Sequence, residues 1–400
     1  MTPDQLSQHP AVRSARLRLA ASGPEVLEEQ LRIVQIPAPS LDEAERGSYL
    51  EERFRHVGLL DVVRDEVGNV LGRLPRPTHS ADPPILVAAH LDTVFPRGTP
   101  LAPRVEGERI YAPGIADNAR GLAAMIALAR VMVETGIRTR GPIWFVGTVG
   151  EEGSGDLRGV KHLFRDGSPF AAAEAFISLD GTGLRRVVHR AIGARRFRVT
   201  VAGPGGHSWA DWGAPNPIHA LGAAIAGMGE LAMSCDPRTT LTVARVGGGT
   251  SINAIPADAW LEVDLRSEDP ASLAGLSAEV ERIALRAVQE ENARRRADSL
   301  SLRAEIQLIG DRPAGSVAQD ERLVRAANLA TRAVGARPDF SASSTDANVP
   351  ISLGIPSVTL GAGGESGGIH TPGEWFADRD STRALERALL ALLAVAEPQG

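Results

Sequence analysis

The feature that most constrains this chain is an apolar run at residues 85–89 that ends abruptly in His90 and Asp92. The run has the length and composition of a strand that is buried on both faces. His90 and Asp92 are two positions apart, so their side chains face the same side of an extended chain. Active sites of open α/β sheets lie in the crevice outside the carboxyl ends of the strands. The run therefore predicts an α/β sheet with a polar site at its edge.

The same pattern recurs along the chain. Three further apolar stretches predict buried strands, at residues 143–149, 175–179 and 357–360. They lead to side chains that can bind metals, namely Glu151 and Glu152, Asp180, and His370. Helices are predicted at residues 25–34, 43–56 and 320–334 and from Asp117 onward, and a Pro- and Gly-rich loop at 95–114. Strands that alternate with helices indicate a three-layer α/β domain with a mostly parallel sheet.

The pattern changes from about residue 193. Shorter alternating strands are predicted at residues 197–201, 241–246, 259–265 and 302–308. Helices start at two N-cap and proline pairs, Asn216-Pro217 and Asp269-Pro270. The order βαββαβ predicts a ferredoxin-like α+β domain at 193–310, inserted into a main domain made of 1–192 and 311–400. A length of 400 residues also favours two domains.

Composition limits the function classes. A formal net charge of -6 argues against a nucleic-acid partner, which usually requires a clustered basic surface. Neither a signal peptide nor a transmembrane run is visible, so we expect a cytoplasmic protein without a membrane partner. Cys235 is the single cysteine, which excludes a disulfide framework and favours an inert thiol.

Seven side chains are expected in one crevice: His90, Asp92, Asp117, Glu151, Glu152, Asp180 and His370. Five carboxylates would repel one another there unless cations neutralised them. Two histidines among them favour zinc, with cobalt or manganese as alternatives, over calcium or magnesium, which prefer oxygen ligands. Two metals could share one carboxylate and activate a water for hydrolysis, with a free carboxylate as proton carrier.

Each residue also has a simpler interpretation when it is taken alone. His90 could be a core histidine, and Asp92 a cap at the end of a strand. Asp117 could be the N-cap of the following helix. Glu151 and Glu152, Asp180 and His370 could belong to ordinary turns and loops. Their joint placement after several predicted strands favours the metal site.

Three motifs resemble a known family: His90-Leu91-Asp92-Thr93-Val94, Gly150-Glu151-Glu152-Gly153 and Ile369-His370-Thr371-Pro372. They are similar to the dinuclear-zinc metallopeptidase family of peptidase T, carboxypeptidase G2, aminoacylase and succinyl-diaminopimelate desuccinylase. The resemblance covers nearly the whole chain, including the inserted domain.

The resemblance implies a role for each residue of the site. Two zinc ions per chain would be bridged by Asp117, with His90 and Asp180 completing one site and Glu152 and His370 the other. Glu151 would be the general base and then acid, and Asp92 would hold the His90 imidazole. In this family the peptide bond after the bridging aspartate, here Asp117-Asn118, tends to be cis. Asn118 departs from the second aspartate of many relatives, but it is not a ligand position.

The predicted inserted domain also contains motifs that resemble those of this family. His207, in Gly205-Gly206-His207-Ser208, resembles the histidine that reaches a partner's active site and stabilises the oxyanion. Asn253 resembles an asparagine of the oxyanion region, and Arg266 an arginine that binds the substrate carboxylate. The resemblance thus implies a homodimer through an inserted lid and dimerisation domain. An exposed loop role for His207, and structural roles for Asn253 and Arg266, are the alternatives.

The main functional hypothesis is hydrolysis of an amide bond in a small peptide, of the aminopeptidase, dipeptidase or carboxypeptidase type. Within the family the ligand at the Asp180 position tends to be aspartate in peptidases and glutamate in deacylases. Residues 250–256 and 344–348 also look like peptidase T. The loop at 343–348 could line the substrate pocket, although capping of the loop itself would explain these residues equally well. Hydrolysis of an N-acyl amino acid is the alternative, and a catalytically silent scaffold is the hypothesis from another class.

Overall fold

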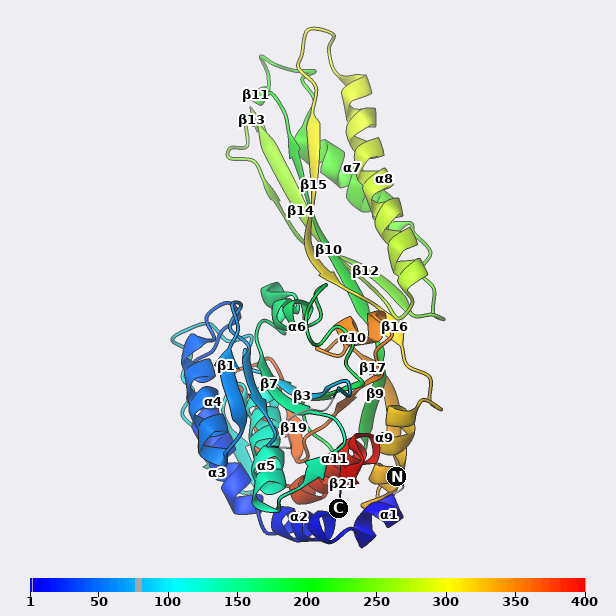
Figure 1. Cartoon of the computed structure of the whole chain (residues 1–400). Helices are drawn as coiled ribbons and strands as arrows, with labels where there is room; N and C mark the ends of the chain where they lie inside the picture. Colours follow the sequence, from blue (N-terminus) through cyan, green and yellow to red (C-terminus); the bar gives the residue numbers. More distant parts are fainter. Residues whose placement is uncertain (2, 76–80, 400) are drawn as a thin grey trace. The chain divides into compact units, whose positions relative to one another are not determined.

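The computed structural model describes residues 1, 3–75 and 81–399. The chain forms two compact units, the first made of residues 1–191 and 316–400 and the second of residues 192–315 (Figure 1). The second unit is thus inserted in the sequence of the first. Within the described residues, no helix is both long and apolar enough to cross a membrane.

The first unit is built on a nine-stranded sheet with the order β1-β2-β7-β3-β8-β18-β9-β16, and β17 also pairs with β9. Strand β3 pairs in parallel with β7 and β8, and β18 pairs in parallel with β8. The strands are β1 (Leu60–Arg64), β2 (Val70–Arg73), β3 (Ile85–His90), β7 (Ile143–Thr148), β8 (Ala175–Leu179), β9 (Arg186–Ala191), β16 (Gly315–Ser316), β17 (Asp339–Ser343) and β18 (Ser357–Leu360). The predicted mixed α/β architecture with a mostly parallel central sheet is confirmed.

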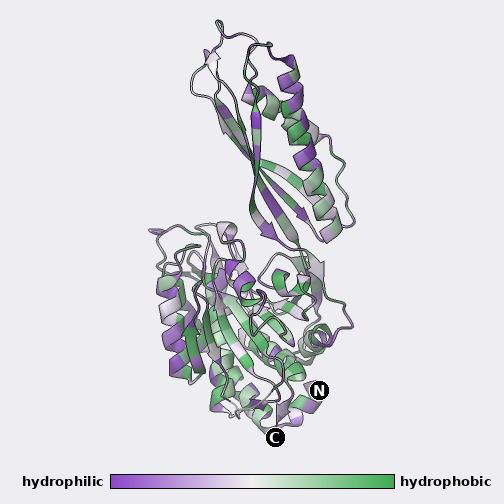
Figure 2. Ribbon diagram, turned by 45° about the horizontal axis from the view of Figure 1, so that its top comes forward, coloured by the Kyte–Doolittle hydropathy of each residue, from purple (hydrophilic) through white to green (hydrophobic). Residues whose placement is uncertain are grey.

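Apolar cores lie on both faces of this sheet. Along β3, Ile85, Val87 and Ala89 join the larger core, whereas Leu86 and Ala88 join the other. This alternation follows from the period of two in a strand and explains why the central strands are continuously apolar, as Figure 2 shows. The helices are α1 (Pro3–Gln8), α2 (Pro10–Ala20), α3 (Gly23–Val34), α4 (Ala44–Val57), α5 (Arg120–Glu134), α6 (Arg158–Leu163), α9 (Arg322–Ala333), α10 (Asn348–Ser352) and α11 (Ser381–Ala396).

A small antiparallel sheet joins segments that are far apart in the sequence. Its order is β19-β20-β5-β4, and its strands are β4 (Arg104–Glu106), β5 (Arg109–Tyr111), β19 (Glu365–Gly367) and β20 (Trp375–Ala377). Residues 104–111 were expected to be loop, and this prediction is wrong because β20 supplies the pairing partner for β5. Two further short strands, β6 (Arg138–Thr139) and β21 (Pro398–Gln399), pair with each other.

The second unit contains a four-stranded antiparallel sheet with the order β12-β14-β10-β15. Its main elements are β10 (Gly193–Ala202), α7 (Pro217–Gly229), β12 (Thr239–Gly248), β14 (Asp258–Ser267), α8 (Pro270–Arg294) and β15 (Arg303–Arg312), and a minor pair is β11 (Gly206–His207) with β13 (Ala254–Ile255). The predicted N-caps are confirmed, because the side chains of Asn216 and Asp269 accept hydrogen bonds from Ile218 N and Ser272 N. Apolar residues of α7, α8 and one face of the sheet form the core.

Candidate metal centre

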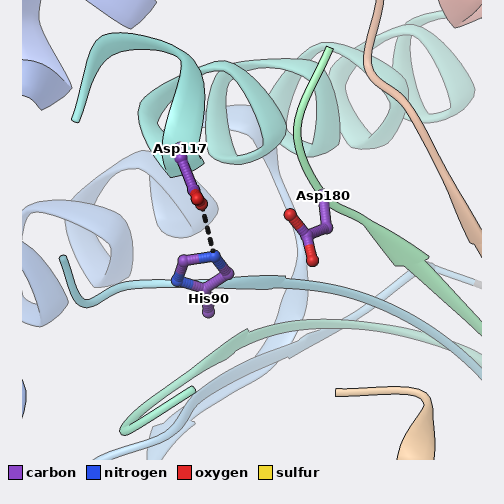
Figure 3. Close-up of side chains that lie close together, drawn as sticks. All are labelled: His90, Asp117 and Asp180. Atoms are coloured by element: carbon purple, nitrogen blue, oxygen red, sulfur yellow. Dashed lines mark hydrogen bonds and ion pairs between the residues drawn. The ribbon is translucent and has the colours of Figure 1, made fainter. Parts of the chain in front are cut away.

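Three neighbouring strands of the first unit deliver polar side chains to one edge of the sheet. His90 is the last residue of β3, Glu151 and Glu152 follow β7, and Asp180 follows β8. Because β3 is parallel to both neighbours, their carboxyl ends lie together, with His90 opposite Thr148. Figure 3 shows His90, Asp117 and Asp180 facing one another, with Asp117 coming from the short π-helical turn Ile115–Ala119 that precedes α5.

His90 is held on both ring nitrogens. Its Nδ1 lies 3.0 Å from the backbone oxygen of Asp92 and 3.5 Å from the Asp92 carboxylate. Its Nε2 lies 3.0 Å from Oδ1 of Asp117. The ring is therefore oriented from the side of Asp92, which leaves Nε2 directed toward the other polar groups of the site.

The Asp92 carboxylate has a second set of partners. It is fully buried and accepts the backbone N–H groups of Glu151 and Glu152, each at 2.9 Å. The Ser40 hydroxyl donates to it at 2.6 Å. Asp92 thus binds the end of β3 to the turn after β7, in addition to contacting His90.

Asp117 lies between two histidines. Its Oδ1 faces His90, and its Oδ2 lies 3.1 Å from Nε2 of His370. The same His370 nitrogen lies 2.9 Å from Oε1 of Glu152. The Asp117-Asn118 peptide bond is cis, as the family resemblance implies.

Asn118 suits its position as an amide. Its Nδ2 donates to the backbone oxygen of Leu179 at 3.0 Å, and its Oδ1 accepts from Gly121 N at 3.1 Å. The side chain is fully buried. An ionised aspartate could accept from Gly121 but could not donate to Leu179. Asn118 therefore joins the start of α5 to the end of β8.

The potential ligand atoms fall into overlapping groups within 4.8 Å of one another. One group is His90, Asp117 and Asp180, and a second is Asp117, Glu152 and His370. A third is His90, Glu151 and Glu152. Asp117 belongs to the first two groups, so its carboxylate is placed to serve two cations. Mixed nitrogen and oxygen donors of this kind fit zinc and related transition metals.

The histidines and carboxylates of this site shift one another's pKa values. Hydrogen bonds to Asp117 and Glu152 raise the pKa of His370 to about 10. Burial opposes the charged form of His90, but its hydrogen bonds, first to Asp117, raise its pKa well above the ordinary value. Burial, and then repulsion by Asp117, raises the pKa of Asp180 to about 6. Protonated imidazoles thus balance the carboxylates, and divalent cations could provide the same compensation.

Glu151 lies deep in the site. It is 5% exposed and follows Gly150, whose φ of +66° lets the chain turn sharply after β7. One of its carboxylate oxygens lies within 4.8 Å of ligand atoms of His90 and Glu152. This position is suitable for a carboxylate that exchanges a proton with a water in the site.

His370 reaches the site by a different route from the one expected. It does not directly follow β18, because the hairpin strand β19 intervenes and His370 lies in the turn between β19 and β20. Its φ is +65°, and about half of its side chain is exposed. The prediction that the fourth buried strand itself leads into the site is therefore wrong in this detail.

The other three predicted residues are His207, Asn253 and Arg266. They lie in the second unit and form hydrogen bonds or an ion pair with neighbouring groups of that unit. Nδ1 of His207 accepts the backbone N–H groups of Trp209 and Ala210 at 3.2 and 3.3 Å. Asn253 accepts from the Ser251 hydroxyl at 2.6 Å. Pairing of β11 with β13 places the segments of His207 and Asn253 side by side.

Arg266 forms an ion pair on the exposed face of the second unit's sheet. Its Nε lies 2.7 Å from Asp264, and Asp264 also pairs with Arg196 at 3.0 Å. About half of the Arg266 side chain is exposed. This guanidinium thus has a structural partner in addition to any ligand.

Two buried acids near the site, Asp346 and Glu374, were not among the predicted site residues. Burial raises the pKa of Asp346 to about 6, and the Thr148 hydroxyl donates to it at 2.5 Å. Burial also raises the pKa of Glu374 to about 7, although it accepts hydrogen bonds from three backbone N–H groups. Asp346 lies in the loop at 344–348, which also caps itself, since Asn348 accepts from Thr345 N. Glu374 could have been noticed in the sequence because it lies four residues after the predicted ligand His370.

The chain is similar to known proteins over most of its length. A family model described as peptidase family M20/M25/M40 matches residues 86–395. Uncharacterized protein YqjE of Bacillus subtilis is 30% identical over 364 residues, which cover 87% of this chain and 92% of YqjE. Succinyl-diaminopimelate desuccinylase of Corynebacterium glutamicum is 27% identical over 243 residues, or 59% of this chain and 64% of that protein.

A solved structure agrees with the family match. The crystal structure of aminopeptidase PepT from Bacillus cereus is similar with a TM-score of 0.72 and 26% identity, covering 94% of this chain and 98% of that one. The family resemblance inferred from the motifs is therefore confirmed. The chain belongs to peptidase family M20/M25/M40 and is a hydrolytic enzyme of that family.

Proposed function

We propose that this enzyme is a two-metal hydrolase that cleaves an amide bond of small peptides. The observation that carries the proposal is the position of Asp117, whose two carboxylate oxygens face His90 and His370 at 3.0 and 3.1 Å. One metal would be held by His90, Asp117 and Asp180, and the other by Asp117, Glu152 and His370. Zinc fits these donors best, with cobalt or manganese as alternatives.

The protein side chains then divide the chemistry. Two bound zinc ions would supply Lewis acidity, which lowers the pKa of a water and polarises the substrate carbonyl. Glu151 takes the proton from that water and returns it to the leaving amine. Asp92 keeps the His90 ring in place and fixes the backbone of Glu151 and Glu152 through its accepted hydrogen bonds.

The second unit would act as a lid and as the dimerisation domain. In this proposal His207 of a partner chain and Asn253 stabilise the oxyanion, and Arg266 binds the substrate carboxylate. The exposed position of all three side chains supports such roles. A cytoplasmic location remains a prediction from the sequence.

Two candidate reactions can be separated by experiment. The aspartate at position 180 and the similarity to an aminopeptidase favour peptides as substrates. The similarity to a desuccinylase favours N-acyl amino acids instead. After loading with zinc or cobalt, hydrolysis of tripeptides with free amino groups should exceed that of N-acetyl and N-succinyl amino acids. Turnover of the acylated compounds alone would overturn the peptidase assignment.

Metal analysis tests the hydrolase against a silent scaffold. The purified protein should bind close to two zinc or cobalt ions per chain, and a chelator should abolish hydrolysis until metal is restored. A protein that binds less than about one ion per chain and stays inactive with added metal would contradict the proposal.

A further inference from the structure

The segment that presents Asp117 depends on one buried side chain. Residues 112–119 connect β5 to α5 and include a short helical turn, Ile115–Ala119, and Glu374 lies against residues 112–117 with no exposed surface. The Glu374 carboxylate accepts three backbone N–H groups of this segment, from Gly114 at 2.9 Å, Ala116 at 2.8 Å and Asp117 at 3.0 Å. Buried backbone donors need such acceptors, and the first N–H groups of the short helical turn Ile115–Ala119 have none within the turn, so the carboxylate supplies it.

The other backbone N–H groups of residues 112–117 show how many of this segment's hydrogen bonds are made to Glu374. Pro113 has no N–H group. Ala112 N donates to the backbone oxygen of Glu374 at 3.0 Å, and Ile115 N donates to Ala112 O at 3.2 Å. Glu374 thus accepts four of the five backbone N–H groups between residues 112 and 117.

Glu374 also belongs to the segment that presents His370. Both residues lie in the turn between β19 and β20, and Glu374 N donates to Thr371 O at 3.0 Å. The next residue, Trp375, pairs with Tyr111 at the end of β5. The Glu374 side chain therefore links the segment of Asp117 to the segment of His370, and these two residues contact each other.

We propose that Glu374 is a positioning residue that sets the placement of Asp117 relative to His370, and thereby the metal affinity of the centre. This inference rests on the proposed function, because it takes Asp117 and His370 as metal-binding residues. Outer partners of metal ligands typically change metal affinity or activity by about 10–100-fold when they are removed.

A carboxylate is required for the arrangement, because three donors converge on two acceptor oxygens. A glutamine offers one oxygen and an NH₂ group, which is itself a donor. Its best orientation keeps the bonds from Ala116 and Asp117 and sets the NH₂ group against Gly114 N–H. Glu374→Gln should therefore shift the Asp117 segment without leaving a cavity.

The test uses the full-length chain with cobalt as the probe. Wild type, Glu374→Gln and a matched control, Glu321→Gln, are stripped of metal and titrated with Co²⁺ against a competing chelator. Binding is followed by visible absorption, which reports ligand geometry. Glu321 is a suitable control because its carboxylate also accepts backbone N–H groups, of Leu323 and Val324, but at the start of α9.

Glu374→Gln should bind at least one of the two cobalt ions about 10–100-fold more weakly and with an altered absorption spectrum. Glu321→Gln should keep the wild-type affinity and spectrum, even where its unfolding midpoint falls by as much as that of Glu374→Gln. Wild-type affinity and spectrum in Glu374→Gln would overturn the inference. Failure of the wild type itself to bind cobalt would overturn the proposed function, and the inference with it.

Discussion

Asn118→Asp is a stringent test of how the site is assembled. The substitution keeps the size of the side chain and its acceptor toward Gly121 N, but it replaces the group that donates to Leu179 O. A protonated aspartic acid could still make both hydrogen bonds, whereas an ionised one could not. The side chain at position 118 is fully buried and directly follows Asp117, so the folded protein should hold an aspartate there in its protonated form.

The expected cost follows from the pKa difference between the states. An unperturbed aspartate has a pKa of about 3.9, and each pKa unit is worth about 1.36 kcal/mol. Keeping the group protonated at pH 7 would cost about 4 kcal/mol, and at pH 5 only about 1.5 kcal/mol. The folded-state pKa is raised, so the folded state binds more protons and stability falls as pH rises from about 4. These values are upper limits, since local rearrangement can accommodate part of the charge.

The assay is urea denaturation of the metal-free protein at several pH values, with the wild-type free energy of unfolding subtracted at each pH. Metal is removed because bound cations would compensate an additional negative charge. Asn118→Ala is the control, because it loses both hydrogen bonds and should show an offset that does not change with pH. An offset of Asn118→Asp that is equally constant with pH would refute the reasoning.

Three further predictions concern the groups of the site. Glu151→Ala should retain both metals but lose at least about a hundredfold in kcat, the scale of a general base; a variant with normal metal content and full activity would refute this role. His207→Ala should lower kcat on peptides with little change in metal content. If the histidine acts across a dimer, a mixture of this variant with Glu151→Ala should be more active than either variant alone; absence of any recovery would contradict action in trans. For the metal-free protein, the raised pKa of His370 implies stability that is complete below about pH 6.5 and is lost as pH rises toward 10. Urea titrations should show this decline, and His370→Asn should make it smaller but leave the part that the raised pKa of His90 contributes.

Much of the centre could be predicted because its residues follow regular elements. His90, Asp180 and the two glutamates come after apolar strands, and parallel pairing brings the ends of such strands together. The predicted strands at 175–179 and 357–360 match β8 and β18 in full. Because these strands are buried on both faces, all of their residues are apolar or small, and the local sequence is sufficient to predict them as strands.

Other parts of the centre depend on pairs that are distant in the chain. Glu374 binds backbone groups more than 250 residues earlier, and Asp346 binds Thr148 across 198 residues. Strands β4 and β5 were not predicted because β5 pairs with β20, a distant segment. The local sequence contains no pattern that indicates this pairing. An isolated acid in a loop has no periodicity to interpret.

The sequence by itself therefore determined the α/β class, the main strands and helices, the chemical types of the metal-binding side chains and the family. The tertiary structure decided which oxygen of Asp117 faces which histidine, how Asp92 holds the turn after β7, and that Glu374 supports the segment of Asp117. The physical reason is the range of the interactions. Hydrophobic periodicity is a local property of the chain, whereas hydrogen bonds that satisfy a buried loop come from whichever segments the fold brings beside it.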